Sequence, residues 1–305
     1  MTDSMFQVSR EVPWHGLGMN VGKAPNSTAA LRLAGLNWKV IQAPLYYTIA
    51  GVDQEVTNRV ANYRSDTGEY FGVVSNRYKI VQNEEAFSFT DSLLGEGIQY
   101  ETAGSLNGGR RVWLLAKMPE RKILGDKFLP YLLFSNGHDG GTAVRVCMTP
   151  VRVVCANTLQ LALETACRTW VYYHRGKIDR KLDEANTTLQ LAGNYMTALT
   201  KEAEHLAVKK MGQRSLAKFI EQLFPMEGTD RQKANVKNEI AYFQSCYMVD
   251  DLTNFRNTKW GVIAAISDYA THKPIKNAKQ QESLFAKTVG GHPLIDRALQ
   301  LIRSI

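Results

Sequence analysis

The two halves of the chain differ in how apolar and polar residues are spaced. Short alternating runs interrupted by glycine or proline predict strands, and apolar residues at steps of three and four predict helices. Strands are predicted over residues 38–47, 58–64, 69–74, 78–82, 99–118 (as a hairpin), 131–135 and 142–155. Helices are predicted over residues 28–33, 84–94, 157–170, 183–224, 230–247, 258–272, 277–289 and 293–302.

This order predicts an α+β fold. An N-terminal antiparallel sheet with flanking helices, a β-β-β-α-like core, is followed by an all-helical C-terminal region. Two domains are expected, over residues 1–175 and 176–305, and a chain of 305 residues is long enough for both. No apolar run reaches the roughly 18 residues of a membrane helix, and the N-terminus lacks the apolar core of a signal peptide. We therefore expect no membrane association and a cytoplasmic location.

The predicted hairpin over residues 99–118 carries cations next to an aromatic residue. Asn107-Gly108-Gly109 supplies residues that tolerate the positive φ of a tight turn. Strand alternation then places Arg111, Trp113 and Lys117 on one face. Such a face suits a nucleic acid, because cations bind phosphates and an indole ring stacks on a base. The alternative is that Trp113 is a core residue between two sheets.

Positive charge is concentrated in the middle of the chain. The formal net charge is +8, and residues 104–181 hold thirteen Lys and Arg against five Asp and Glu. The excess in this span equals that of the whole chain, so the remainder is close to neutral. A basic stretch on a β-rich segment is typical of nucleic-acid binding, although a solvated basic face has the same composition.

A glycine-rich loop over residues 136–141 is the best candidate for chemistry. His138 and Asp139 lie side by side among glycines, which could form a metal site or an acid–base pair. The backbone N–H groups could also hold a phosphate. The third interpretation is a turn in which Asp139 accepts hydrogen bonds from its own backbone.

Several common site types are missing from the sequence. The four cysteines, at 147, 155, 167 and 246, form no Cys-x-x-Cys pair, so no zinc site is predicted. The sequence also lacks a Walker A motif, a Gly-x-Ser-x-Gly elbow and His-Glu-x-x-His. We therefore predict no cofactor, no metal and no catalytic residue, and a protein that acts without ATP.

Long motifs along the chain resemble a known family. They begin with Val-Pro-Trp-His-Gly-Leu-Gly and occupy residues 12–18, 78–83, 85–87, 103–106, 109–113, 135–140 and 149–159. Together they are similar to phage- and plasmid-borne proteins grouped as a domain of unknown function. This resemblance implies a mobile-element source and no established activity. The element order and basic sheet also resemble single-strand annealing proteins of the Rad and Redβ type, which form rings or filaments on DNA.

The leading hypothesis is a phage or plasmid protein that binds and anneals single-stranded DNA during recombination, as a homo-oligomer and in the host bacterial cytoplasm. Duplex DNA and RNA are further possible partners. The residues expected to contact nucleic acid are Arg110, Arg111, Trp113, Lys117, Arg145, Arg152, Asn136 and His138. Two alternatives stay open: an oligomeric interaction protein, such as a counter-defence factor, and a nucleic-acid-processing enzyme that uses the His138-Asp139 loop.

Overall fold

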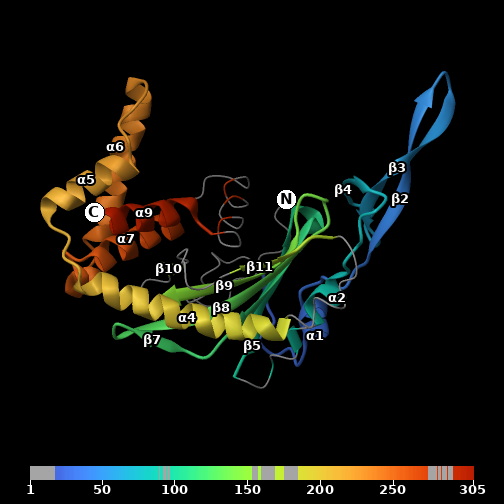
Figure 1. Cartoon of the computed structure of the whole chain (residues 1–305). Coiled ribbons are helices and arrows are strands. Elements are labelled where there is room, and N and C mark those ends of the chain that lie inside the picture. Colours follow the sequence, from blue (N-terminus) through green and yellow to red (C-terminus); the bar gives the residue numbers. More distant parts are fainter. Residues whose placement is uncertain are drawn as a thin grey trace. The chain divides into compact units, whose positions relative to one another are not determined.

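A computed structural model describes most of the chain (Figure 1). The described residues are 18–88, 90–91, 94, 97–152, 157–158, 169–174, 185–273, 280, 283, 287 and 291–305; the side chains of 151–152, 157–158 and 185–191 are not included. The chain divides into two compact units. Unit 1 holds Met1–Pro119, Tyr131–Cys147 and Thr169–Ala192, and unit 2 holds Glu120–Pro130, Met148–Arg168 and Gly193–Ile305. The predicted boundary at residue 175 falls outside the described residues.

The larger sheet confirms the antiparallel part of the predicted α+β fold. Its eight strands follow the order β1-β5-β6-β8-β9-β10, with β11 paired to β9 and β7 paired to β8. The pairings of β5 with β1 and β6, of β8 with β6 and β7, and of β9 with β10 and β11 are antiparallel. The strands are β1 (Met19–Asn20), β5 (Gln99–Leu106), β6 (Arg111–Lys117), β7 (Arg121–Ile123), β8 (Asp126–Gly137), β9 (Val144–Arg152), β10 (Asn157–Thr158) and β11 (Thr169–Tyr172).

A second sheet in unit 1 has three strands in the order β2-β3-β4. They are β2 (Val40–Ile49), β3 (Val52–Arg64) and β4 (Tyr70–Ser75). Strand β3 begins six residues before the strand predicted over 58–64, and it forms with β2 a hairpin that turns at Ala50 and Gly51, both at positive φ. Strand β4 pairs with β3 only between Arg59 and Tyr63. Residues 45–58 therefore form a two-stranded extension, which we call the β-arm (Figure 1).

Two short helices of unit 1 lie between β1 and β5 along the chain. Helix α1 (Ser27–Leu33) starts where predicted, because the side chain of Asn26 accepts a hydrogen bond from the Ala29 N–H at 2.8 Å. Helix α2 (Asn83–Ser88) is shorter than predicted. The strand predicted over 78–82 is wrong, since none of these residues is in a strand.

The helix predicted over residues 157–170 is also wrong at both of its ends. Residues Asn157–Thr158 pair with β9 as β10, and Thr169–Tyr172 pair with β9 as β11. Thr, Trp, Val and Tyr favour the pleated surface of a sheet, and this preference prevails over the helical spacing. Residues 159–168 lie outside the described part of the chain.

Unit 2 has the predicted helical C-terminal region. Its helices are α4 (Ala185–Val208, whose first turns belong to unit 1), α5 (Gln213–Leu223), α6 (Asp230–Tyr247), α7 (Lys259–His272) and α9 (Pro293–Ser304). The span 183–224, which was predicted to be largely helical, forms α4 and α5, and Gly212 is the N-cap of α5. Of the helix predicted over 277–289, only residues 280, 283 and 287 are described, and these are helical.

Helix α7 forms the centre of the unit 2 core. Eleven of its fourteen residues are buried, including Trp260. The rings of Phe219 and Phe224 lie 6.4 and 6.0 Å from that of Phe243, and Phe224 also packs edge-on against Tyr269 at 5.7 Å. Among the described residues, no helix combines the length and the apolar character needed to span a membrane.

Candidate nucleic-acid interface

The strand expected to bind nucleic acid is buried on both faces. Strand β6 lies between β5 and β8, and every residue from Val112 to Ala116 is at most 1% exposed. The ring of Trp113 packs so closely on Gly18 and Gly104 that a Cβ at either position would lie within 3 Å of it. No base can reach this ring. The prediction that Trp113 stacks on a base is therefore wrong, and its interpretation as a core residue is correct.

The predicted cations do not gather on one open face. Arg110, Arg111, Lys117 and Arg145 are each partly buried. Arg111 is paired with Gly137 and Lys117 with Tyr131, so these two lie at opposite ends of β6, about 20 Å apart at 3.3 Å per residue. Arg110 donates a hydrogen bond to the Tyr70 carbonyl at 3.2 Å. Arg152 ends β9, and its side chain lies outside the described set.

His138 is a structural residue inside unit 1. It is 0% exposed, and its ring lies 5.6 Å from that of Trp38 and 5.7 Å from that of Phe71. Asn83 donates its amide to the Leu36 carbonyl, so its Oδ1 accepts from His138 Nε2 at 2.8 Å. Burial and the nearby His174 lower the pKa of His138 to about 3, so the ring is neutral.

Asp139 stabilises the glycine-rich loop itself. Its Oδ1 accepts hydrogen bonds from the backbone N–H groups of Gly141 at 2.9 Å and Thr142 at 3.0 Å. The turn interpretation of residues 136–141 is thus confirmed, and His138 and Asp139 do not pair. Asn136 is 0% exposed and donates to the Val81 carbonyl at 2.8 Å. Direct nucleic-acid contacts by Asn136 and His138 are therefore excluded in this structure. Within the described residues, no cluster of His, Cys, Asp and Glu could hold a metal.

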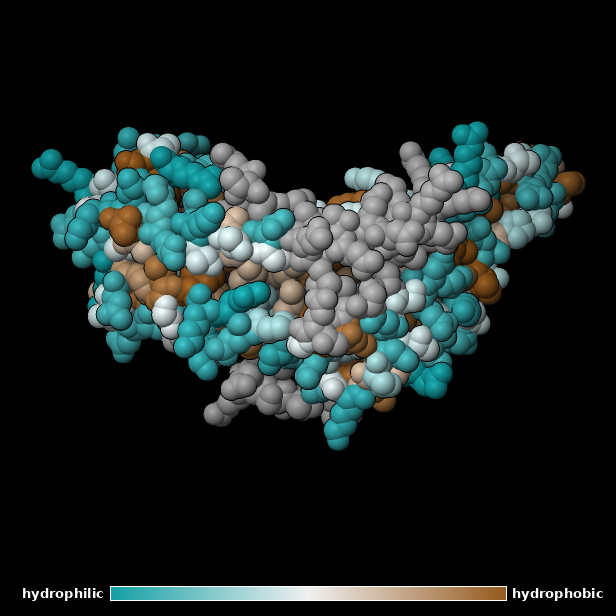
Figure 2. All heavy atoms as spheres, turned by 60° about the horizontal axis from the view of Figure 1, so that its bottom comes forward, coloured by the Kyte–Doolittle hydropathy of each residue, from teal (hydrophilic) through white to brown (hydrophobic). Residues whose placement is uncertain are grey.

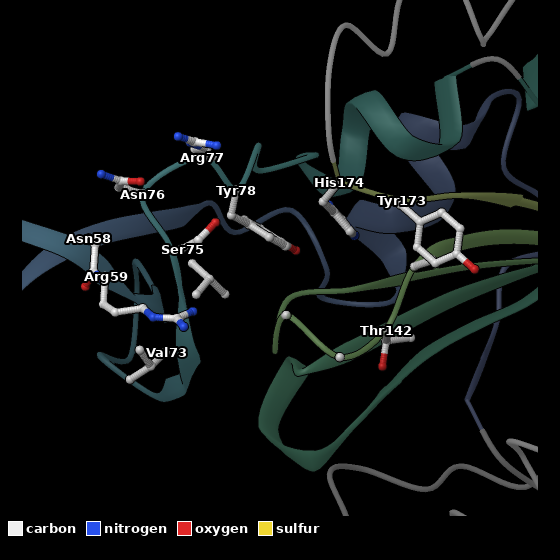
Figure 3. A pocket seen from close by; sticks show the side chains of 14 residues that line it. Asn58, Arg59, Val73, Ser75, Asn76, Arg77, Tyr78, Thr142, Tyr173 and His174 are labelled. Atoms are coloured by element: carbon white, nitrogen blue, oxygen red, sulfur yellow. The ribbon is translucent and has the colours of Figure 1, made fainter.

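A cleft of about 1220 Å³ lies within unit 1, and the end of the glycine-rich loop forms part of its lining (Figure 3). Three segments line it: the ends of β3 and β4 where they pair, the loop after His138, and the residues that follow β11. The lining residues are Asn58, Arg59, Val73, Val74, Ser75, Asn76, Arg77, Tyr78, Gly140, Gly141, Thr142, Ala143, Tyr173 and His174. Most of these side chains are polar, and none carries a negative charge.

Two arginines give the cleft its charge. Arg59 is paired with Ser75 across the β3–β4 ladder, which brings it to the segment that continues to Arg77. Both arginines are exposed residues, and neither forms an ion pair with any described residue. The nearby carboxylate of Asp139 is held by the amides of its own loop. An anion in the cleft would therefore meet two available cations.

The family assignment follows from a comparison with models of known families. The model for the domain of unknown function DUF932 matches residues 70–289. The chain belongs to the DUF932 family. No curated protein and no solved structure is significantly similar to it. The DUF932 match includes β4, the glycine-rich loop and Tyr173-His174, whereas Arg59 and the β-arm precede it.

Within the DUF932 region, an aromatic pair forms part of the cleft wall. The ring of Tyr78 stacks on that of His174 at 4.6 Å, and its hydroxyl donates to the Gly137 carbonyl at 3.0 Å. His174 and Lys79 are joined twice: His174 Nδ1 donates to the Lys79 carbonyl, and the Lys79 N–H donates to the His174 carbonyl, both at 3.1 Å. Burial lowers the pKa of His174 and raises that of Tyr78, so both groups are uncharged at neutral pH. Next to this pair, Tyr173 is 69% exposed.

Sequence reasoning missed every charged and aromatic residue of the cleft. A signal for Arg59 and Arg77 was present, because the predicted hairpin over 58–64 and 69–74 brings residue 59 close to residue 75. The sequence pattern did not indicate that Tyr173 and His174 line the cleft, since a helix was predicted just before them. The DUF932 match alone assigns none of these residues a role.

Proposed function

We propose that this protein binds single-stranded DNA in the unit 1 cleft. Arg59 and Arg77 contact phosphates, and the exposed ring of Tyr173 stacks on a base. The observation that carries the proposal is a polar cleft with two arginines, neither of them ion-paired to a described residue, and no carboxylate among the lining residues. Guanidinium groups and aromatic faces are the two components that single-strand binding requires.

The dimensions and the aromatic ring favour a single strand over a small ligand or a duplex. The cleft volume of about 1220 Å³ exceeds the roughly 300–1,000 Å³ typical of small-molecule pockets. A base in a duplex is already stacked on its neighbours, so Tyr173 gains a stacking partner only from an unpaired base. The formal net charge of +8 also favours a polyanionic ligand.

We further propose that this binding serves the ATP-independent annealing of phage or plasmid DNA in the host cytoplasm. The support is indirect: the sequence contains no Walker A motif, and its motifs resemble proteins carried by mobile elements. An annealing assay with complementary strands and no nucleotide tests this extension separately from binding.

The first test measures affinity for a labelled single-stranded oligonucleotide by fluorescence anisotropy. The variant Arg59→Glu/Arg77→Glu removes both cleft cations, and Arg121→Glu/Lys122→Glu makes the same charge change at exposed positions of β7. Losing two charge-assisted hydrogen bonds of about 1.5 kcal/mol each predicts roughly a hundredfold weaker binding for the cleft variant. The proposal fails if both variants lose affinity equally or if the cleft variant binds like the wild type.

A further inference from the structure

The β-arm exposes apolar side chains that its own fold cannot bury. Every residue from Tyr46 to Glu55 is exposed, and four large apolar side chains lie near the tip: Tyr46 (59% exposed), Tyr47 (44%), Ile49 (60%) and Val52 (61%). In Figure 2, apolar atoms are visible among hydrophilic ones at the right-hand end, where the arm lies in Figure 1. Strand alternation and pairing place three of them, Tyr47, Ile49 and Val52, on one face of the arm, and contiguous exposed apolar surface marks interaction sites.

The β-arm is a regular ladder. Tyr46 is paired with Glu55, Tyr47 with Gln54, Thr48 with Asp53 and Ile49 with Val52. The Tyr47 hydroxyl donates to Gln54 Oε1 at 2.8 Å, and the Thr48 hydroxyl donates to Asp53 Oδ1 at 2.7 Å. A two-stranded ribbon alone is marginally stable in water, and both of its outer edges present unpaired backbone groups. A bound partner would stabilise it through these edges and through the apolar tip.

The charge of the β-arm identifies the kind of partner. Residues 45–58 contain Asp53 and Glu55 but no lysine or arginine. A nucleic acid would be repelled by this arm, whereas a basic protein surface would attract it. The arm contributes −2 to a net charge of +8, which leaves +10 on the rest of the same chain. A second copy of the chain therefore offers the complementary charge.

We infer that the β-arm of one molecule docks on a second copy, on the part outside its arm that carries the net charge of +10. Contact between two arms would bring carboxylates of like charge together, so the arm binds a different surface of its neighbour. Such a head-to-tail contact repeats, and it gives a ring when the rotation closes and a filament when it does not. This assembly does not require DNA, so it can be tested independently of the proposed DNA binding.

The experiment measures molar mass by light scattering over a range of protein concentrations without DNA. The wild type is expected to form multiples of 34.2 kDa. The variant Ile49→Ser/Val52→Ser, at an exposed cross-strand pair, is expected to shift self-association to at least about tenfold higher concentration, as one lost apolar contact of about 1.4 kcal/mol requires. The control Leu33→Ser/Val208→Ser changes side chains that are 50% and 75% exposed elsewhere and should retain the wild-type mass.

A second variant tests the direction of the contact. Asp53→Asn/Glu55→Gln removes both charges while keeping the size of the side chains. Head-to-tail docking predicts weaker assembly of this variant, and an arm-to-arm contact predicts stronger assembly. The inference is overturned by a wild type that stays monomeric, by an Ile49→Ser/Val52→Ser variant that assembles like the wild type, or by stronger assembly of the uncharged variant.

Discussion

The buried imidazole of His138 makes the stability of unit 1 depend on pH. Its pKa falls from an ordinary 6.5 to about 3, first because burial removes water from the charged form and second because His174 is close. Replacing His138 with phenylalanine keeps an aromatic ring beside Phe71 and removes the titrating group. The same change leaves Asn83 Oδ1 without the hydrogen bond that His138 Nε2 donates.

The size of the effect follows from the two pKa values. As the pH falls below 6.5, the unfolded chain binds a proton at His138 that the folded chain does not bind. The free energy of unfolding therefore falls by about 1.36 kcal/mol per pH unit, until the folded form also binds the proton near pH 3. The total is about 5 kcal/mol. At neutral pH the variant loses about 1–3 kcal/mol, because a buried amide oxygen is left unpaired.

The two stability curves should therefore cross at about pH 5. Urea unfolding from pH 7.5 to 4, followed by tryptophan fluorescence, measures both curves, and Trp38 lies 5.6 Å from the replaced ring. His174 and His292, whose pKa values are also lowered, titrate in both proteins, so the difference between the curves isolates His138. A stability difference that stays constant over this pH range would refute the reasoning.

Two further predictions concern packing and capping. Trp113→Ala should lower the free energy of unfolding by about 3–5 kcal/mol, because the ring is only 1% exposed; the denaturant midpoint measures this loss. A loss below about 1 kcal/mol, together with weaker DNA binding, would instead support base stacking by Trp113. Thr229→Ala should lower the free energy of unfolding of unit 2 by about 1 kcal/mol in the same assay, because Thr229 and Gln232 form a capping box at the start of α6. An unchanged free energy of unfolding would show that the cap does not stabilise the helix.

Helices were predicted better than strands because their signals are local. Helix α6 has the predicted bounds, and α7 and α9 begin within one residue of them, each at a residue suited to a helix start: Thr229, Thr258 and Pro293. These signals lie within a few residues of the helix they define. Sequence alone was therefore sufficient for much of unit 2.

The binding surface could not be predicted in the same way. Alternation along β6 shows which residues share a face, but burial depends on neighbouring strands and on glycines such as Gly18 and Gly104, which let Trp113 pack closely. The cleft combines segments near residues 59, 77 and 173, which only strand pairing brings together. No local pattern contains that information.

The most direct test of DNA binding in the cleft is the salt dependence of single-strand affinity. Each phosphate contact contributes about 0.7 to the slope of log K against log salt. The variant Arg59→Ala/Arg77→Ala should therefore have a slope about 1.4 smaller than the wild type, whereas Arg121→Ala/Lys122→Ala should keep the wild-type slope. Equal slopes for the wild type and the cleft variant would show that the phosphates do not bind at Arg59 and Arg77, and would contradict the proposed function.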